Sequence, residues 1–512
     1  MVRLISISLL FFATAVLHAG VVTWDGDSGD KEWFNPINWD GDFVPVANDD
    51  VIIPSSFVVN LTEDTAIQSL RVNGMLTIEN SGVLDVFVAG QNGVTINNGM
   101  LVVDGTINVA LAGTNGVEIR NSADLIINGK FTINDVGLHG INLLSNAELR
   151  VSGTLDIINA ASKGINMIQH CSVEILRNAS VAIEQVQSGI LITSSFINNG
   201  AILISQPIIS GIFNDGINIV ENGILENLLS GSIAINSEFD RGMVNRGEVL
   251  NSGAMTIENS TLIGLCTDNS GSFENSGELS IHSILRDAVE FSRNSVFENR
   301  ATGEISISGV NEVSQSIDLV QSTMINDGRI SMFNFEGHGI FIRAGSMINS
   351  GEIFISSEGG QRLISNDGSF INSTDGTIIM EVDNADRIIS NTQLFMNEGI
   401  IDYTGIFTES FVNNYGFNTL FENSGILSAG ALAISEAIKI QSSSTMINSG
   451  EIDIVVGSLL SRGIEVSGDA VMTNTSSGDI MLDVMGTSSG DPMFIEVGSV
   501  FDGFGLFDIR MN

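Results

Sequence analysis

The feature that most restricts the fold of this 512-residue chain is an internal repeat. From Phe196 onward an apolar residue is followed two positions later by Asn, then by Gly, and then by alternating apolar residues, as in FENSGELSI (273–281) and MINSGEIFI (347–355). Eleven intervals cover 276 residues, a mean of about 25, and the asparagines that mark them are Asn198, Asn227, Asn251, Asn275, Asn299, Asn326, Asn349, Asn372, Asn397, Asn423, Asn448 and Asn474. Regularity at this period indicates a solenoid of stacked units.

A second marker lies half a period away from the asparagines. It is a short apolar stretch, often opened by glycine, as in GVTI from Gly93, GINL from Gly140 and, more weakly, GIEV from Gly463. Because this marker occurs before the asparagine series, we expect the repeats to begin near residue 70. About 17 coils of about 25 residues then fill residues 70–512.

The repeating unit has the pattern of strands. Stretches such as Ile107-Asn108-Val109 alternate apolar and polar residues, and no coil holds the 10–12 residues of helical periodicity that a helix needs. The sequence therefore predicts an all-β fold, a right-handed, single-stranded parallel β-helix. The Phe or Met two residues before each Asn should point inward and stack on its equivalent, and the Asn should hydrogen-bond along the stack at a corner that tolerates left-handed backbone.

Other repeat folds fit less well. Leucine-rich repeats share the period and an Asn ladder, but they close a Leu-rich run with their Asn, whereas here the Asn precedes the strand. A β-propeller needs about 40–50 residues per blade, and the calcium-binding nonapeptide G-G-x-G-x-D of β-rolls is not found in the sequence.

The first 19 residues, MVRLISISLLFFATAVLHA, have the layout of a secretory signal peptide, with Arg3 before an apolar run and a small residue, Ala19, at the end. The run is shorter than the about 20 apolar residues of a membrane-spanning helix. We expect residues 1–19 to be removed and the mature chain to be secreted or placed on the cell surface without inserting into the membrane.

The charge balance excludes several partners. Sixty acidic and 20 basic residues give a net charge of −40, and the acids are spread along the chain. Nucleic acids and anionic membranes need basic patches, so we expect neither as a partner. A surface glycan or a protein is the expected partner, and the sequence leaves its identity and the oligomeric state open.

Residues 20–69 differ in kind from the repeats. The segment TWDGDSGDKEWFNPINWDGDFVPVANDDVIIP (23–54) holds all three tryptophans of the chain, Trp24, Trp33 and Trp39. We expect a cap that covers the apolar end of the first coil, because an open solenoid end invites aggregation. The alternative is a carbohydrate site, since exposed tryptophan faces stack on sugars.

The spacing of this segment resembles the W-x-G…W-x-x-x-x-N-W-x-x-G-x-x-P-x-x-x-D-D-V-x-I-P opening of bacterial autotransporter and adhesin-like surface β-helix proteins. The matching residues are Trp24, Gly26, Trp33, Asn38, Trp39, Gly41, Pro45, Asp49, Asp50 and Pro54. The resemblance implies an exported surface protein of adhesin-like type and implies no particular ligand.

At the other end the chain stops at FDGFGLFDIRMN (501–512), still in the repeat rhythm, which predicts an uncapped last coil or a truncated product.

The two cysteines, Cys171 and Cys266, are nearly four coils apart, about 18 Å along the axis. A disulfide needs Cα atoms within about 7 Å. We therefore predict two unpaired, buried thiols.

No residue pattern predicts an active site, a cofactor or a metal centre, and we expect weak surface calcium at most. His139, His170, His282 and His338 lack ligand spacing, and His139 and His338 precede glycine where a turn role is expected. The expected function is a non-catalytic, adhesin-like or structural β-helix. The alternative is a polysaccharide lyase or glycoside hydrolase of the pectin-lyase-like type, which would need paired carboxylates and an aromatic cleft.

Overall fold

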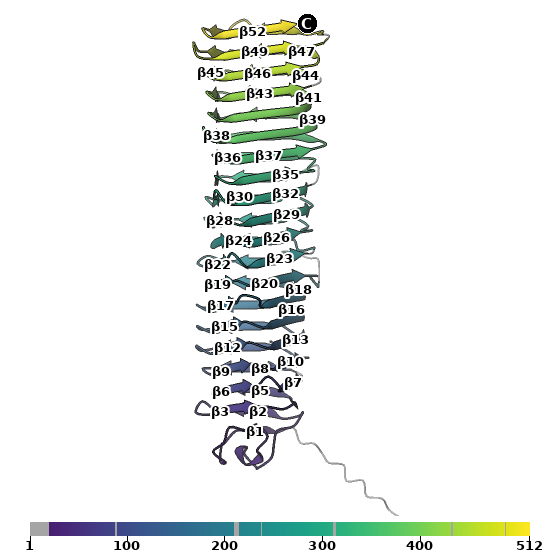
Figure 1. Ribbon diagram of the computed structural model, residues 1–512, viewed down its shortest axis with the longest axis vertical. Helices are drawn as coiled ribbons and strands as arrows, with labels where there is room; N and C mark the ends of the chain where they lie inside the picture. The colour runs from purple at the N-terminus through teal and green to yellow at the C-terminus, as the bar shows by residue number, and fades with distance from the viewer. Residues whose placement is uncertain are drawn as a thin grey trace, which may run out of the picture.

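The computed structural model describes residues 20–87, 90–208, 214–236, 238–310, 314–431, 434–486 and 488–511. The proposed signal peptide, residues 1–19, lies outside the described residues. The chain forms a parallel β-solenoid of about 18 turns of about 24 residues, which confirms the predicted fold class (Figure 1). The strands pair in parallel with their equivalents in neighbouring coils, on both sides inside the rod and on one side at its ends.

Each coil contributes to three sheets, which we name the glycine sheet, the ladder sheet and the middle sheet in chain order. The glycine sheet begins with β1 (Val21–Thr23) and β2 (Asp50–Ile53) and continues through β5 (Ser69–Val72), β8 (Val94–Asn97), β11 (Val117–Arg120), β14 (Ile141–Leu144), β21 (Asp215–Ile219), β24 (Arg241–Asn245), β27 (Ile263–Thr267), β30 (Val289–Ser292), β33 (Gln315–Val320), β44 (Ile434–Gln441), β47 (Leu459–Val466) and β50 (Asp491–Ile495).

The ladder sheet consists of the strands that carry the asparagine marker and their equivalents in the first coils. It contains β3 (Val58–Leu61), β6 (Met75–Ile78), β9 (Met100–Val103), β12 (Asp124–Ile127), β15 (Glu148–Val151), β17 (Ser172–Ile175), β19 (Ser195–Asn198), β22 (Ile224–Asn227), β25 (Glu248–Asn251), β28 (Ser272–Asn275), β31 (Val296–Asn299), β34 (Thr323–Asn326), β40 (Leu394–Asn397), β42 (Leu420–Asn423), β45 (Thr445–Asn448), β48 (Val471–Asn474) and β51 (Val500–Gly503).

The middle sheet follows the turn after the ladder sheet. It contains β4 (Thr65–Ile67), β7 (Val83–Phe87), β10 (Thr106–Ala110), β13 (Lys130–Val136), β20 (Ala201–Ser205), β23 (Ser232–Asn236), β26 (Ala254–Glu258), β29 (Glu278–Ile284), β32 (Glu304–Val310), β35 (Arg329–Phe333), β37 (Glu352–Ser357), β43 (Ile426–Ala431), β46 (Glu451–Val456), β49 (Asp479–Val484) and β52 (Leu506–Met511).

Some strands continue around a corner and belong to two sheets. Four run from the middle sheet into the glycine sheet, namely β16 (Thr154–Ile168), β18 (Ser180–Ile192), β39 (Thr377–Asn391) and β41 (Ile400–Tyr415). Two run from the glycine sheet into the ladder sheet, namely β36 (His338–Asn349) and β38 (Gly360–Asn372).

Coil stacking starts earlier than residue 70. β2 pairs with β5, with Val51 opposite Leu70, and β3 pairs with β6, with Val59 opposite Leu76. The glycine and asparagine markers are weak in these first coils, so the sequence pattern placed the first repeat about one coil too late.

The predicted inward stacking of the Phe and Met column is confirmed. Phe370, Phe395 and Phe421 lie in consecutive coils with ring centroids 4.8 Å apart and ring planes 7° and 3° from parallel. All three rings are fully buried. In the first coils the same column holds aliphatic residues, among them Leu101 and Leu125, so the core changes character along the rod.

The predicted Asn ladder is also confirmed. Each of the twelve asparagines is at most 1% exposed, and each Nδ2 donates to the Oδ1 of the next at 2.7–2.8 Å without a break from Asn198 to Asn474. None of these twelve asparagines has a positive φ, although the corner was expected to tolerate left-handed backbone. Positive φ values belong instead to turn residues such as Asn294 (63°) and Asn418 (61°).

The glycine after each ladder asparagine is required by the close approach of neighbouring coils. A Cβ atom at Gly351 would lie 2.1 Å from the carbonyl oxygen of Gly328 in the coil below. That contact is far inside van der Waals distance and involves backbone, so a side chain there would push the coils apart.

The N-terminal segment closes the first coil. Trp24, Trp33 and Trp39 are at most 1% exposed, and Trp39 packs edge-on against the other two at centroid distances of 4.9 and 4.8 Å. The Nε1 atom of Trp39 donates to the Trp33 carbonyl at 2.7 Å, and η1 (Pro36–Asn38) leads into it. This burial leaves no Trp face for a sugar, so the capping interpretation is favoured.

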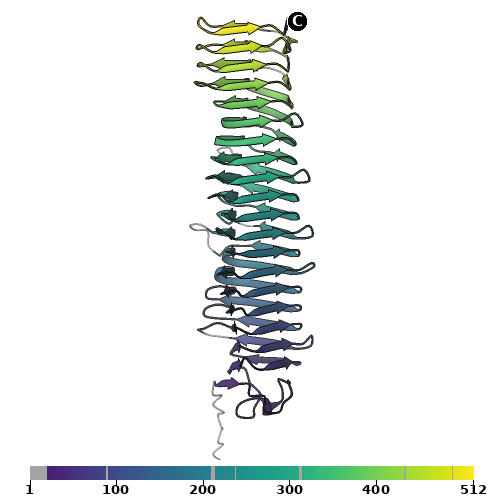
Figure 2. The ribbon, with the colours of Figure 1, turned by 90° about the vertical axis from the view of Figure 1, so that its left-hand side faces the viewer.

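The opposite end is open within the described residues. β50, β51 and β52 pair with the coil below and have no described strand beyond them. Phe504 is 72% exposed there and Leu506 is 62% exposed. The two ends of the rod therefore differ, as Figures 1 and 2 show.

Cys171 and Cys266 are both free and buried, as predicted. Cys171 directly precedes β17 of the ladder sheet, whereas Cys266 lies in β27 of the glycine sheet. The two thiols are thus separated by sheet as well as by height. Burial raises the pKa of Cys266 to about 12, so its thiol is protonated at neutral pH.

Candidate functional site

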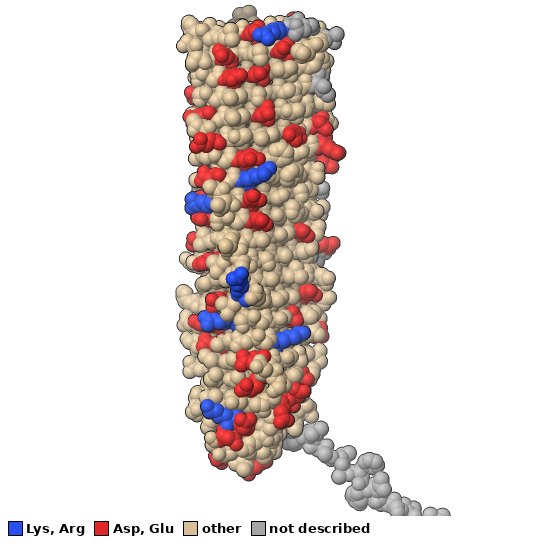
Figure 3. Space-filling model, viewed as in Figure 1, with Lys and Arg blue, Asp and Glu red and all other residues tan. Residues whose placement is uncertain are grey.

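The glycine sheet concentrates the basic residues of an acidic chain. Eleven of the 20 Lys and Arg residues lie on its strands or directly after them: Arg71, Arg120, Lys163, Arg241, Arg246, Arg293, Arg343, Arg362, Arg387, Lys439 and Arg462. The face seen in Figure 3 also shows basic residues among the scattered acidic ones. The ion pairs with the most buried carboxylates, Arg241–Asp215 and Arg343–Asp318, lie on the glycine sheet.

Two carboxylates of this sheet are buried and paired with arginine from the next coil. Arg241 Nε lies 2.7 Å from Asp215 Oδ1, and Nη2 lies 3.1 Å from Oδ2. Arg343 makes the same kind of two-point contact with Asp318, whose side chain is fully buried. Burial raises the pKa of both carboxyls, and the arginines act in the opposite direction.

Glu290 is stacked directly beneath Asp318, because β30 pairs with β33 in this register. Like charges placed opposite each other in neighbouring strands destabilise a sheet. The pKa of Glu290 is raised by burial first and then by the charges of Asp318 and Asp287, while Arg343 lowers it. Asp287, Glu290 and Asp318 thus form a carboxylate cluster beside one arginine, with Asp287 and Asp318 buried and Glu290 partly exposed.

Two of the four predicted histidines lie on this sheet, far apart along it. Burial lowers the pKa of His139 to about 4, with the charge of Lys163 in the next coil acting in the same direction. Burial also lowers the pKa of His338, beside Arg362. Both rings are neutral at pH 7, and neither Nδ1 atom has a hydrogen-bond partner among the described residues.

The remaining candidates from the sequence do not come together. His282 lies on the outside of the middle sheet, where its Nδ1 is 2.7 Å from the Ser308 hydroxyl, and His170 lies in a turn. Tyr403 is buried and donates to the Val382 carbonyl at 2.8 Å. Within the described residues no group of three His, Cys, Asp or Glu side chains is placed to hold a metal ion.

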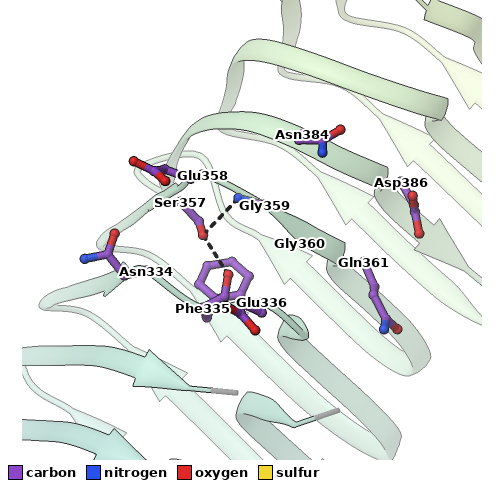
Figure 4. A pocket seen from close by; sticks show the side chains of 10 residues that line it. All are labelled: Asn334, Phe335, Glu336, Ser357, Glu358, Gly359, Gly360, Gln361, Asn384 and Asp386. Carbon is purple, nitrogen blue, oxygen red and sulfur yellow. Dashed lines mark hydrogen bonds between the residues drawn. The ribbon is translucent and has the colours of Figure 1, made fainter. Parts of the chain in front are cut away.

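A shallow groove of about 710 Å³ lies at the corner between the middle and glycine sheets (Figure 4). Its sides come from the connection between β35 and β36, the connection between β37 and β38, and the corner of β39. The lining is rich in carboxylates and amides: Asn334, Glu336, Glu358, Gln361, Asn384 and Asp386.

The floor of this groove is fixed by short local contacts. Ser357 donates to the Phe335 carbonyl at 2.6 Å and accepts from the Gly359 amide at 3.4 Å. Phe335 itself is 1% exposed and belongs to the core, so it offers no ring face to a ligand. The groove suits a hydroxyl-rich or cationic group and carries no aromatic platform.

Comparison with protein-family models and with curated protein sequences gives no match for this chain. Among the described residues there is also no helix with the length and apolar character that a membrane crossing requires.

The carboxylate cluster was not found from the sequence, although a signal for it exists. Cys266, Glu290 and Asp318 hold the same place in successive glycine-sheet strands. Aligning the coils on that strand would have placed them in one column. The irregular loop lengths between these coils hide the column when only the asparagine series is followed.

Proposed function

We propose that this chain is exported and acts at the cell surface or outside the cell as a non-catalytic β-helix rod with an adhesive or structural role. The observation that supports this most is the constancy of the coil. About 18 turns keep a length of about 24 residues, so the rod presents long flat faces and short corners. Coils stacked at about 4.8 Å give a rod about 85 Å long, a suitable element for holding a contact surface away from its anchor.

Several features agree with this role. The resemblance of residues 23–54 to the opening of adhesin-like surface proteins supports export, as does the signal-like sequence of residues 1–19. The shallow groove and the mixed charges of the glycine sheet supply polar contacts for a glycan or protein ligand. Neither depends on a bound cofactor.

The alternative is a polysaccharide lyase or hydrolase, and one observation favours it. Asp287, Glu290 and Asp318 include two carboxyls with raised pKa, and perturbed carboxyls on a strand face are typical of general acids. Against it stands the position of the cluster, since Asp287, Glu290 and Asp318 line neither the groove of Figure 4 nor any of four other surface grooves.

The test compares binding with turnover in the full mature chain. The chain is immobilised and probed with a panel of neutral and acidic glycans, and the same glycans are assayed for new reducing ends and for unsaturated products. The proposal expects retention of at least one glycan or cell-surface extract and no product. Product formation that is lost in both Glu290→Gln and Asp318→Asn would overturn it in favour of the enzyme.

Export is tested separately by the intact mass of the protein from the native culture fluid. The proposal expects a chain that begins at Gly20. A chain that retains residues 1–19 in the cytoplasm would contradict it.

A further inference from the structure

The outer side of the ladder sheet changes character along the rod. In each four-residue strand the second and fourth residues are buried and the first and third face outward. From β12 to β31 the outward positions are strongly charged, with Asp124, Glu148, Arg150, Glu174, Glu226, Glu248, Glu274 and Glu298. This part resembles the acidic surface expected from the composition.

From β34 to β48 the same positions are almost free of charge. We call these residues the uncharged strip: Thr323, Ile325, Ser346, Ile348, Ser369, Ile371, Leu394, Met396, Leu420, Thr445, Ile447, Val471 and Thr473, interrupted only by Glu422. Each is partly exposed on a flat parallel sheet. Figure 2 turns toward the viewer the left-hand edge of Figure 1, where β28 and β45 of this sheet are labelled.

A charge-free strip is unexpected on a chain of net charge −40. A solvated surface on such a chain would carry acids here, as the stretch from β12 to β31 does. Isoleucine, leucine and methionine at these outward places bring no hydrogen bond and no charge, and they do not complete the core, which the inward Phe and Met column fills. Phe417, in the turn that leads into β42, is 79% exposed at the margin of the strip.

We propose that the uncharged strip is a self-association surface on which a second copy of this chain packs side by side. Two copies repel each other over most of their surface, because each carries a net charge of −40. The strip is the longest part of the described ladder sheet with so little outward charge, so two copies can approach here with the fewest carboxylates facing each other; a shorter uncharged stretch lies at the other end, on β3, β6 and β9. An identical flat strip on each copy satisfies the self-complementarity that a two-fold pair needs.

The size of the strip sets the strength of the pair. Seven coils spaced by about 4.8 Å span about 30 Å, and a four-residue strand adds about 13 Å of width. With the flanking turns and Phe417, each copy buries on the order of 400–600 Å². This is below the about 800 Å² per partner of a standard stable interface, so the pair should be weak and dependent on concentration.

The experiment measures the mass of the full mature chain by sedimentation equilibrium over a range of concentrations and at low and high salt. We expect the average mass to rise from that of one chain toward two as concentration increases. We also expect stronger association at higher salt, because salt screens the repulsion between the two acidic rods. A chain that remains single under all these conditions, or that associates less at high salt, would overturn the proposal.

The double variant Ile348→Glu with Ile371→Glu places two charges in the centre of the strip. We expect the same fold with a small loss of stability, because the two new charges lie opposite each other, as Glu274 and Glu298 already do beside Arg300 in the same column. We expect the association constant to fall at least tenfold.

The matched control is Phe354→Glu with Ile379→Glu, which adds the same charges in neighbouring coils on the outside of the middle sheet. The control should associate as the wild type does, apart from the small effect of two more charges, and circular dichroism checks the fold of both. An equal loss in both variants, or no loss in the ladder-sheet variant, would overturn the proposal. If the wild-type chain stays monomeric and binds a neutral polysaccharide through the same strip, the partner is that polysaccharide and the proposal is overturned.

Discussion

The lower and upper coils of the ladder sheet form the same corner with different chemistry. From Leu61 to Ile175 the fourth residue of each strand is aliphatic, from Asn198 to Asn474 it is asparagine, and in β51 it is Gly503. The backbone pairing continues in register through both changes, with Ile175 directly opposite Asn198. The corner therefore accepts an aliphatic or an amide column, and the amide at the boundary stays satisfied because the Oδ1 of Asn198 accepts from the Gly200 amide.

The aromatic stack of the upper coils gives the largest expected effect. Phe395→Ala removes a ring held between Phe370 and Phe421 and leaves a cavity in the core, so we expect a loss of about 3–5 kcal/mol. In the lower coils Leu125→Ala should cost less, about 2–4 kcal/mol, because a smaller side chain is removed. Urea unfolding followed by circular dichroism measures both, and an equal or larger loss at Leu125 would contradict the ranking.

The amide column gives the next effect. Asn349→Val interrupts the ladder, leaving the Nδ2 of Asn326 without its acceptor and the Oδ1 of Asn372 without its donor. Because each orphaned buried group costs about 1–3 kcal/mol, we expect a loss of about 2–4 kcal/mol. Asn198→Val, at the end of the ladder beside the aliphatic column, leaves the Oδ1 of Asn227 without its donor and the Gly200 amide without its acceptor, so it should cost about as much. A loss of less than about 1 kcal/mol at Asn349 would show that the ladder does not hold the coils together.

The carboxylate cluster gives a smaller effect that depends on pH. Burial and the neighbouring carboxylates raise the pKa of Glu290 in the folded chain, so the folded chain binds this proton more tightly than the unfolded chain does. Ionised Glu290 therefore costs stability at pH 7, and this cost disappears as the pH falls through the raised pKa toward the ordinary value of 4.5.

Glu290→Gln should consequently raise stability at pH 7 and leave it nearly unchanged near pH 4. The charged groups that act on Glu290 are Asp318, Asp287, Arg343 and Asp268, and all remain in the variant. Melting temperatures of both proteins across this pH range provide the measurement. A benefit that grows toward acid pH would contradict the assignment.

The exposed ion pairs of Arg300, on the outside of the ladder sheet, give the smallest effect. Arg300 lies 2.8 Å from Glu274 and 2.6 Å from Glu298, and all three side chains are solvent-exposed to a large degree. Pairs of this kind contribute about 0–1 kcal/mol, so Arg300→Ala should change stability by less than about 1 kcal/mol. A loss as large as that of Asn349→Val would mean that the outer surface, and not the inner columns, holds these coils together.

Much of the fold follows from the sequence because every coil of a solenoid places equivalent residues in the same surroundings. The asparagine series predicted the inward stack and the ladder, since each depends only on the residue that recurs at one place. The first coil was missed because Leu61 and Ile78 replace the asparagine there, and an aliphatic residue in a strand is not a distinctive marker. The candidate site was harder to predict. Glu290 and Asp318 become neighbours only when the coils are stacked in register, and their separation in sequence includes loops of unequal length.

The central claim is that equivalent residues of consecutive coils lie directly opposite each other, and disulfide trapping tests it most directly. Ser346 and Ser369 face outward from neighbouring coils in this register, so the double variant Ser346→Cys with Ser369→Cys should oxidise readily to an intramolecular disulfide. Thr323→Cys with Ser369→Cys spans two coils, about 9.6 Å, and should not. The account predicts a crosslink in the first variant alone, seen as a peptide pair by mass spectrometry under non-reducing conditions. A crosslink in the second variant, or none in the first, would contradict it.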